Sequence, residues 1–227
     1  LMSQVVKEQE FKRKSEISAL QAQINPHFLY NTLDSIVWMA EAKKSEEVVL
    51  MTSALARLFR SSISKGRELV LIQTELEHIT NYLTIQQMRY RDKLTFHIDV
   101  APKILNYLTL NILLQPLVEN AIYHGIKNKS GIGVITIRGC EDQDKVIFHV
   151  IDNGVGMDEA TIARILSNQA ASERRGMGVA NVHERIQLYF GDAFGLSYES
   201  EPDVGTSVII RIPKIDPDAI EQWETEE

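Results

Sequence analysis

The sequence Gln23-Ile24-Asn25-Pro26-His27-Phe28-Leu29-Tyr30-Asn31 places a proline beside a histidine within a segment that otherwise has the pattern of a long helix. Proline in a helix interior removes a backbone hydrogen bond and costs about 3 kcal/mol. Two interpretations of this stretch stay open: a kinked helix with a half-buried histidine, and an imidazole displayed as a nucleophile on the flank of a helical bundle. Bundle spacing, with residues three and four apart, is typical of coiled coils and is seen at Ile17, Leu20, Ile24, His27, Asn31, Asp34 and Trp38.

The helical pattern extends on both sides of this stretch. We expect one helix over residues 3–42, a turn at residues 43–45, and a second helix that ends near residues 64–66. The helical pattern is present from the first residues of the sequence, so we expect the first helix to continue upstream of Leu1. Two helices cannot enclose a core alone, but a second copy of the chain would complete a four-helix bundle. The sequence therefore predicts a homodimer, with residues 1–66 as its helical dimerisation unit.

Beyond residue 66 the pattern changes to a mixture of strands and helices. Thr74-Glu75-Leu76-Glu77 has the form of a capping box and predicts the start of a helix that ends near residue 91. The later segments predict strands over 94–100, 132–139, 145–152, 196–200 and 207–212, and helices over 110–126, 159–166 and 178–190. Because strands and helices do not alternate strictly, the fold class is α+β, a sandwich with helices on one face of a mixed sheet.

The domain organisation follows from these patterns. We expect a mixed domain of strands and helices over residues 67–213, in which residues 67–91 form a connecting helix region, and an acidic tail over residues 214–227. The helical hairpin of residues 1–66 precedes this domain.

Composition excludes several classes of function. The net charge is −7 and the basic residues are dispersed, which argues against nucleic acid as a partner. The lone cysteine, Cys140, permits neither an intrachain disulfide nor a cysteine-based metal site. The sequence has no run of about eighteen apolar residues that could span a membrane, and it shows no signal peptide.

Three segments combine polar residues or glycines in a way that suits a nucleotide. They are residues 115–125, 152–156 and 176–178. Asn120 in the first segment offers a neutral oxygen to Mg²⁺, which needs only one or two protein ligands beside phosphates. Asp152 in the second can accept a hydrogen bond from the exocyclic amine of adenine.

Glycines supply the other features of such a site. Gly154 and Gly156 permit a turn with positive φ and the close approach of a flat base. Gly176 and Gly178 leave the N–H groups of the following helix open to phosphate, and Arg185 is close enough in sequence to add a cation. The usual phosphate-binding patterns are missing, because there is no G-x-x-x-x-G-K-[ST] and the second glycine pair lacks the third glycine of a dinucleotide fingerprint.

In order and spacing these segments resemble the N box and the two glycine boxes of the Bergerat-type ATP-binding fold, which histidine kinases share with gyrase-type ATPases and related chaperones. Gly205-Thr206 resembles the last element of that fold, near the base. Upstream, residues 20–33 resemble the phosphoacceptor box of LytS/YesM-type sensor histidine kinases. The resemblance covers residues 20–213.

This resemblance implies a role for each matching residue. His27 resembles the phosphoacceptor, with Asn31 as its catalytic neighbour. The resemblance thus implies histidine phosphotransfer for residues 1–66 and an ATP-binding catalytic domain for residues 67–213. Asn120 resembles the Mg²⁺ ligand and Asp152 the adenine-binding aspartate. Contacts with the nucleotide are implied for His124, Gly154, Gly156, Gly176, Gly178, Arg185 and Thr206.

The chain also departs from commoner histidine kinases. Phe28 follows the phosphoacceptor, where those kinases place an acidic residue, and Tyr123 replaces a lysine of the N box. The lid between Asp158 and Arg175 is short. Pro116 stands one helical turn before Asn120, where hydrolytic relatives carry a glutamate that activates water. We therefore expect slow hydrolysis of ATP.

The interpretation that unites these observations is the cytoplasmic catalytic core of a two-component sensor histidine kinase. It implies ATP and Mg²⁺ as cofactors, autophosphorylation of His27, transfer to an aspartate of a response regulator, and upstream transmembrane sensor segments that anchor it at the plasma membrane. Two alternatives remain: a Bergerat-fold ATPase or clamp that does not need His27, and a signalling scaffold with a degenerate site.

Overall fold

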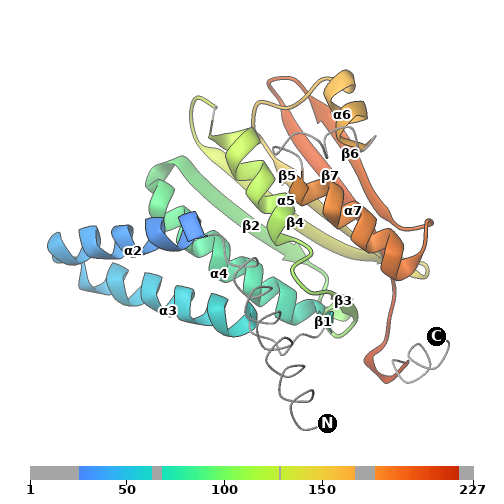
Figure 1. The fold of residues 1–227 in the computed structure, drawn as a ribbon, viewed down its shortest axis with the longest axis horizontal. Coiled ribbons are helices and arrows are strands. Elements are labelled where there is room, and N and C mark those ends of the chain that lie inside the picture. The colour runs from blue at the N-terminus through green and yellow to red at the C-terminus, as the bar shows by residue number, and fades with distance from the viewer. Residues whose placement is uncertain (1–25, 63–67, 128, 167–176, 220–227) are drawn as a thin grey trace, which may run out of the picture. The chain divides into compact units, whose positions relative to one another are not determined.

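The computed structural model describes residues 26–62, 68–127, 129–166 and 177–219 (Figure 1). The chain divides into two compact units, residues 1–66 and 67–227. Each unit is described by itself below. Within the described residues, no helix has both the length and the apolar character needed to cross a lipid bilayer.

The first unit is a helical hairpin. Helix α2 is described from Pro26 to Glu41, and α3 runs from Ser45 to Ser62, as the sequence predicts for the turn and the second helix. The expected course of the first helix through residues 3–25, and with it the kink at Pro26, lies outside the described residues. The side chains buried in the hairpin are Phe28, Thr32 and Met39 on α2 and Met51, Ala54, Leu55 and Leu58 on α3.

The stripe with bundle spacing lies on the outer side of α2. His27, Asp34 and Trp38 are exposed and Asn31 is half-buried. Trp38 has 71% of its surface exposed, and Tyr30, Leu33 and Val37 are also exposed. The hairpin therefore leaves an apolar surface uncovered within one copy of the chain.

The second unit contains a five-stranded mixed sheet. Its strands, in spatial order, are β2 (Leu94–Val100), β4 (Gly133–Asp142), β5 (Lys145–Asp152), β7 (Gly205–Pro213) and β6 (Gly195–Glu201). Strand β2 pairs parallel with β4, and the other neighbours are antiparallel. A small antiparallel sheet joins β1 (Leu69–Leu71) to β3 (Leu108–Leu110).

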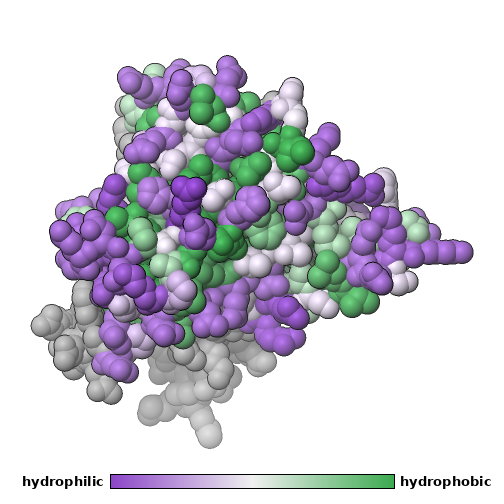
Figure 2. Space-filling model, turned by 180° about the vertical axis from the view of Figure 1, so that it is seen from behind, coloured by the Kyte–Doolittle hydropathy of each residue, from purple (hydrophilic) through white to green (hydrophobic). Residues whose placement is uncertain are grey.

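Helices cover one face of the large sheet, which confirms the α+β class. Helices α5 (Gln115–Asn120) and α7 (Met177–Phe190) lie on the same face of it (Figure 1). Strand residues that point toward this face are buried, and they include Ile137, Phe148, Val150, Val208 and Ile210. Alternate residues such as Arg138, His149 and Ser207 lie on the opposite face and are more exposed. Figure 2 shows the molecule from behind, where polar side chains are interspersed with apolar ones.

Helix α4 (Ile72–Tyr90) begins three residues earlier than a capping box with Thr74 as its N-cap predicts. Its N-cap is Leu71, and no side chain caps it. The N–H groups of Ile72 and Gln73 instead donate to the carbonyl oxygens of Tyr107 and Leu105, at 2.8 and 3.0 Å. The capping role predicted for Thr74 is therefore wrong, because a distant loop satisfies these N–H groups.

The segment predicted as one helix over residues 110–126 consists of three parts. Strand β3 ends at Leu110, α5 begins only at Gln115, and Ala121–Ile126 form a π-helix, labelled η3. Between β3 and α5, Ile112 adopts a left-handed backbone conformation with φ of 56°. The prediction of a single helix is wrong because pairing of β3 with β1 requires extended chain there.

The remaining helices are short. Helix α6 spans Glu159–Leu166, and single 3₁₀ turns occupy Arg91–Lys93, Pro102–Ile104 and Pro217–Ala219. Packing continues past Pro213, because Ile215 is buried and its carbonyl oxygen accepts from the N–H of Leu108 at 2.9 Å.

Candidate functional site

His27 and Asn31 face each other on the outer side of α2. Residues four apart in a helix lie one above the other, and the Asn31 amide nitrogen lies 3.1 Å from each ring nitrogen of His27. An amide N–H can donate to whichever ring nitrogen carries a lone pair. Asn31 is thus placed to orient the imidazole, while the side chain of His27 is exposed to solvent.

The next residue, Phe28, is buried and points into the hairpin. An acidic residue at this position would direct its carboxylate into the same buried environment. Asn31 is a polar side chain that the structure places against the imidazole.

In the second unit, Asn120 ends α5 and the π-helix η3 follows directly. Single turns of π-helix occur frequently at functional sites. Here the wider turn carries Tyr123 and His124 and brings Gly125 against the end of strand β5. A Cβ atom on Gly125 would lie 2.6 Å from Oδ1 of Asp152. Only glycine permits this approach, so the backbone of η3 packs directly against the side chain of Asp152.

Asp152 is the last residue of β5, and 6% of its surface is exposed. Its Oδ1 atom accepts from the N–H of Gly154 at 2.8 Å, and the backbone N–H of Thr206 also donates to its carboxylate. Burial raises the pKa of Asp152 to about 6, although these two hydrogen bonds and nearby Lys129 act in the opposite direction. A buried carboxylate with spare acceptor capacity can read the amine of a purine base.

The loop after Asp152 needs glycine at two positions for different reasons. A Cβ on Gly154 would overlap the backbone of Gly125. Gly156 has φ of 65°, and a Cβ there would overlap the carbonyl of Glu201. The N–H of Asp203 donates to the carbonyl of Val155 at 2.7 Å, which ties this loop to the β6–β7 turn.

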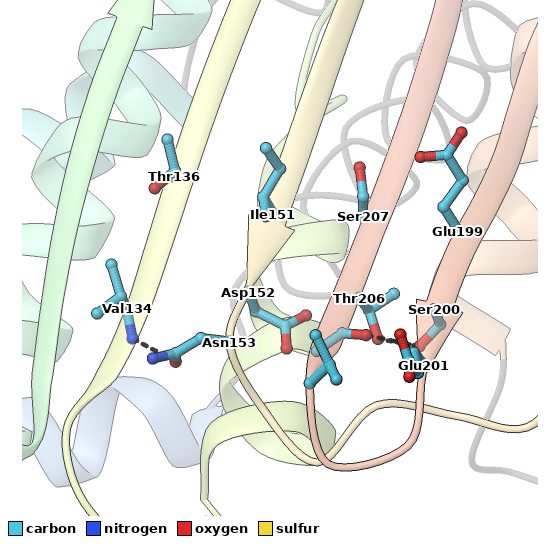
Figure 3. A pocket seen from close by; sticks show the side chains of 12 residues that line it. Val134, Thr136, Ile151, Asp152, Asn153, Glu199, Ser200, Glu201, Thr206 and Ser207 are labelled. Atoms are coloured by element: carbon cyan, nitrogen blue, oxygen red, sulfur yellow. Dashed lines mark hydrogen bonds between the residues drawn. The ribbon is translucent and has the colours of Figure 1, made fainter.

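Thr206 pairs with Asp152 across the β5–β7 ladder. Its hydroxyl lies 2.8 Å from that of Ser200 on β6. Figure 3 shows Asp152, Thr206 and Ser200 together where the three strands end. This cluster places the predicted Thr206 next to the predicted Asp152.

A groove of about 520 Å³ adjoins this cluster. A row of side chains across four strands lines it on the sheet face away from the helices: Thr136, Ile151, Ser207 and Glu199 (Figure 3). The Asn153 side chain lies beside the groove, and its Oδ1 atom accepts from the N–H of Val134 at 2.8 Å. The groove therefore lies on the other side of the sheet from Asn120 and α7.

The second glycine segment is described only in part. Gly178 lies in the first turn of α7, and Gly176 lies outside the described residues. Arg185, on the same helix, donates through Nη2 to the carbonyl of Asn111 and lies 3.8 Å from Glu68. These contacts engage the guanidinium of Arg185 within the domain, and its predicted contact with the nucleotide stays a prediction. His124 is exposed on η3.

The residues present fit a Mg²⁺-bound nucleoside triphosphate. Asp152 supplies the buried acceptor for a base, and the glycines Gly125 and Gly154 let the backbone pack closely against it. Among the described residues, no group of three or more His, Cys, Asp or Glu side chains is arranged to hold a metal. A hard cation such as Mg²⁺ would instead use the neutral oxygen of Asn120 together with phosphates and water.

Sequence reasoning missed two residues of this site. Gly125 lies against Asp152, 27 positions later in the chain, and only its place at the end of a polar-interrupted helix could have indicated it. Lys129 donates to the carbonyl of Asn153 and lowers the pKa of Asp152. No local pattern marks this lysine.

The fold and the site define a class of protein in which a histidine-bearing helical unit is joined to an ATPase-type domain. Residues 15–94 match the "Histidine kinase" family, and residues 106–216 match the "Histidine kinase-, DNA gyrase B-, and HSP90-like ATPase" family. In both parts the chain is similar to sensor histidine kinases of the YesM and LytS type.

Relatives support this assignment. The chain is 39% identical to sensor histidine kinase YesM of Bacillus subtilis, over 94% of this chain and 36% of that protein. It is 37% identical to sensor histidine kinase YpdA of Escherichia coli, over 90% and 35%, and 33% identical to sensor protein LytS of Bacillus anthracis, over 88% and 34%. The chain thus spans about a third of the length of these curated relatives.

Solved structures share the fold. The histidine kinase domain of a blue-light activated histidine kinase from Erythrobacter litoralis aligns over 91% of this chain and 94% of that chain, with a TM-score of 0.51 and 14% identity. The catalytic domain of histidine kinase ThkA aligns over 65% and 97%, with a TM-score of 0.51 and 19% identity.

Proposed function

We propose that this chain is the catalytic core of an ATP-dependent protein-histidine kinase that transfers the γ-phosphoryl group of ATP to His27. The observation that supports this most directly is the exposed imidazole of His27, held by Asn31, in a chain whose second unit carries the ATPase-type site around Asp152. A nucleotide clamp without kinase activity would have no use for this pair.

Each part of the nucleotide would meet a different part of the second unit. Asp152 accepts from the exocyclic amine of adenine, while Gly125 and Gly154 let the neighbouring backbone pack against its carboxylate. The N–H groups at the start of α7 face the phosphates, since helix N-termini attract anions. Mg²⁺, held by Asn120 and the phosphates, would neutralise the charge that develops on the phosphoryl oxygens.

The chemistry at His27 requires a lone pair on one ring nitrogen. That nitrogen forms a bond to the γ-phosphorus as the bond from phosphorus to the β–γ bridging oxygen breaks, and ADP leaves. The proton on the other ring nitrogen is released to solvent when the phosphohistidine returns to neutral charge. Asn31 would hold the ring plane from one helical turn away. With the amide turned so that its oxygen accepts from the protonated ring nitrogen, the other nitrogen keeps its lone pair to react.

We further propose that the chain works as a homodimer and passes the phosphoryl group from His27 to an aspartate of a response regulator. The uncovered apolar surface of α2, around Trp38 and Val37, supports dimerisation. The sensor relatives support a place in two-component signalling, with this chain on the cytoplasmic side of the membrane.

Labelling with γ-³²P-ATP tests the transfer. The protein should acquire label that is stable to base and labile to acid, and His27→Ala should lose it while keeping its affinity for Mg²⁺-ATP. His97→Ala, which removes an exposed imidazole on β2 of the second unit, serves as a control and should keep the label. Undiminished acid-labile label on the His27 variant would contradict the proposal.

A further inference from the structure

One face of α4 carries polar side chains in the interior of the second unit. His78, Tyr82 and Gln86 are 3%, 1% and 0% exposed, and Arg89 follows one turn later. Because residues three and four apart share a helix face, these four side chains form a line along α4. Buried polar groups are costly unless they are hydrogen-bonded. The hydrogen-bond partners of these four side chains therefore indicate their role.

The hydrogen bonds of this line converge on Glu119 of α5 from two sides. From one side, Arg89 Nη1 donates to Gln86 Oε1 at 3.0 Å, Gln86 Nε2 donates to the Tyr82 hydroxyl at 2.6 Å, and that hydroxyl donates to Glu119. Each donor in this series belongs to α4, and the final acceptor belongs to α5.

From the other side the connection passes through Gln115. His78 Nε2 lies 2.6 Å from Gln115 Oε1, and Gln115 Nε2 donates to Glu119 Oε1 at 2.8 Å. An amide oxygen only accepts, so His78 donates in this pair. The carboxylate of Glu119 is therefore the common acceptor of both series.

The start of α5 is held by α4 as well. Glu75, 1% exposed, accepts from the N–H of Ile112 at 2.9 Å and from that of Leu114 at 2.8 Å. These bonds hold the left-handed backbone of Ile112, a conformation that costs a β-branched residue about 1–3 kcal/mol. Helix α4 thus fixes both ends of α5.

Helix α5 and the π-helix η3 that continues it comprise six residues each. A helical segment of this length is marginal on its own, so contacts with α4 stabilise its geometry. Asn120 is the last residue of α5, directly after Glu119, and the backbone changes there to the π-helix η3. A shift of the Glu119 carboxylate would therefore move the end of the helix that presents Asn120.

We propose that Glu119 is a positioning residue for the Mg²⁺–nucleotide site: by accepting from Tyr82 and Gln115 it fixes the helix end that presents Asn120. This inference rests on the proposed role of Asn120 as the Mg²⁺ ligand. It assigns Glu119 to orientation of the helix and not to contact with ATP.

Glu119→Gln in the full-length chain tests this. A glutamine keeps the size of the side chain, but its NH₂ group opposes one of the two converging donors. Partners that orient metal ligands typically contribute 10–100-fold to affinity. We expect about a tenfold loss of affinity for Mg²⁺-ATP in calorimetry and less than a twofold loss for ATP in EDTA.

Glu77→Gln is the matched control. Glu77 is on α4 and accepts from Gln73 at 3.1 Å, but this pair is exposed. It should leave both affinities unchanged. Equal losses with and without Mg²⁺ for Glu119→Gln, or no loss at all, would overturn the inference.

A double-mutant cycle with Asn120→Ala separates this inference from the proposed function. If Glu119 acts through Asn120, adding Glu119→Gln to Asn120→Ala should cause no further Mg²⁺-dependent loss. Additive losses would overturn the inference alone. An Asn120→Ala variant with unchanged Mg²⁺ dependence would instead refute the metal role of Asn120.

Tyr82→Phe supplies a second test that is independent of the charge at Glu119. It removes the hydroxyl donor and keeps the buried ring, so the fold should persist in circular dichroism. We expect about a threefold Mg²⁺-specific loss of affinity, smaller than for Glu119→Gln because Gln115 still donates. An unchanged Mg²⁺-ATP affinity in folded Tyr82→Phe would count against the positioning role, even if Glu119→Gln failed to fold.

Discussion

At the scale of single residues, Asp152 combines an energetic cost with a binding role. Burial raises its pKa from 3.8 to about 6, so the folded domain favours the protonated form. The corresponding stability is present below pH 3.8 and is lost as the pH rises through about 6. Above that pH the ionised carboxylate costs the free domain about 3 kcal/mol. An adenine amine that donates to Asp152 would offset part of this cost.

Asp152→Asn should therefore become more stable relative to wild type as the pH rises, while it binds ATP more weakly than wild type at every pH. The amide does not titrate, so its thermal stability relative to wild type should increase between pH 5 and pH 8, by about 1 kcal/mol in the free energy of unfolding. Its affinity for ATP should fall at both pH values, because an NH₂ group would face the adenine amine. Unfolding of both proteins, followed by circular dichroism at each pH, measures the trend.

The relevant comparison is the difference between the two proteins at each pH, since all other titrating groups are common to both. A difference that stays constant from pH 5 to pH 8 would show that Asp152 is not shifted. ATP affinity equal to that of wild type would remove its role in reading the base.

The sequence predicts Asp152 and Thr206 separately, and the structure pairs them across β5 and β7. Their residue types suggest acceptor chemistry without any knowledge of the fold. The contact of Gly125 with Asp152 could not be predicted in the same way, since it depends on a π-helical turn that the side-chain pattern does not encode.

At the scale of elements, strong alternation made strands predictable. Residues 94–100 alternate between apolar and polar, residues 145–152 are rich in β-branched and other apolar residues, and they form β2 and β5 at the expected positions. Strands β1 and β3 have three residues each, which is too short for alternation to show. They are stabilised by each other across a separation of about forty residues, and no local window contains both.

The element that carries Asn120 was the hardest to predict for the same reason. Apolar residues recur with helical spacing from Leu110 to Ile126, so the pattern predicts one helix. The structure interrupts it at Ile112, whose backbone conformation depends on Glu75 of α4. Interactions with a distant element decide this geometry, and hydrophobic periodicity cannot report them.

At the scale of the whole molecule, the uncovered stripe on α2 predicts dimerisation through residues 1–66. The full chain should sediment as a dimer at micromolar concentration, and residues 67–227 should sediment as a monomer. The shorter protein should begin no later than residue 67, because the carbonyl of Glu68 accepts from the N–H of Asn111 at 2.8 Å and β1 starts at Leu69.

Trp38→Glu offers a test that keeps the full chain. Trp38 is largely exposed in one copy, so the change should leave helicity intact and weaken the dimer by at least tenfold, as expected when a buried aromatic anchor of an interface is lost. Cys140→Ser alters an exposed side chain of the second unit and should leave the dimer unchanged. A monomeric wild-type chain at micromolar concentration would refute the four-helix bundle.

The γ-phosphoryl group of ATP has two possible fates: hydrolysis to free phosphate and transfer to His27. Hydrolysis needs a base that activates water near Asn120, and the position one turn earlier is Pro116, which can neither accept a proton nor orient water. Glu119 is the nearest carboxylate in the chain, but it already accepts from Gln115 and Tyr82. A general base contributes about 10²–10⁴-fold to such a reaction. The imidazole of His27 brings its own lone pair and depends less on such a base.

Release of free phosphate should therefore be slow in the steady state, while a single turnover should label His27 readily. Both products can be followed in one sample containing γ-³²P-ATP. In His27→Ala the label should disappear without any rise in phosphate release. Rapid release that persists in this variant would contradict the kinase proposal and favour an ATPase.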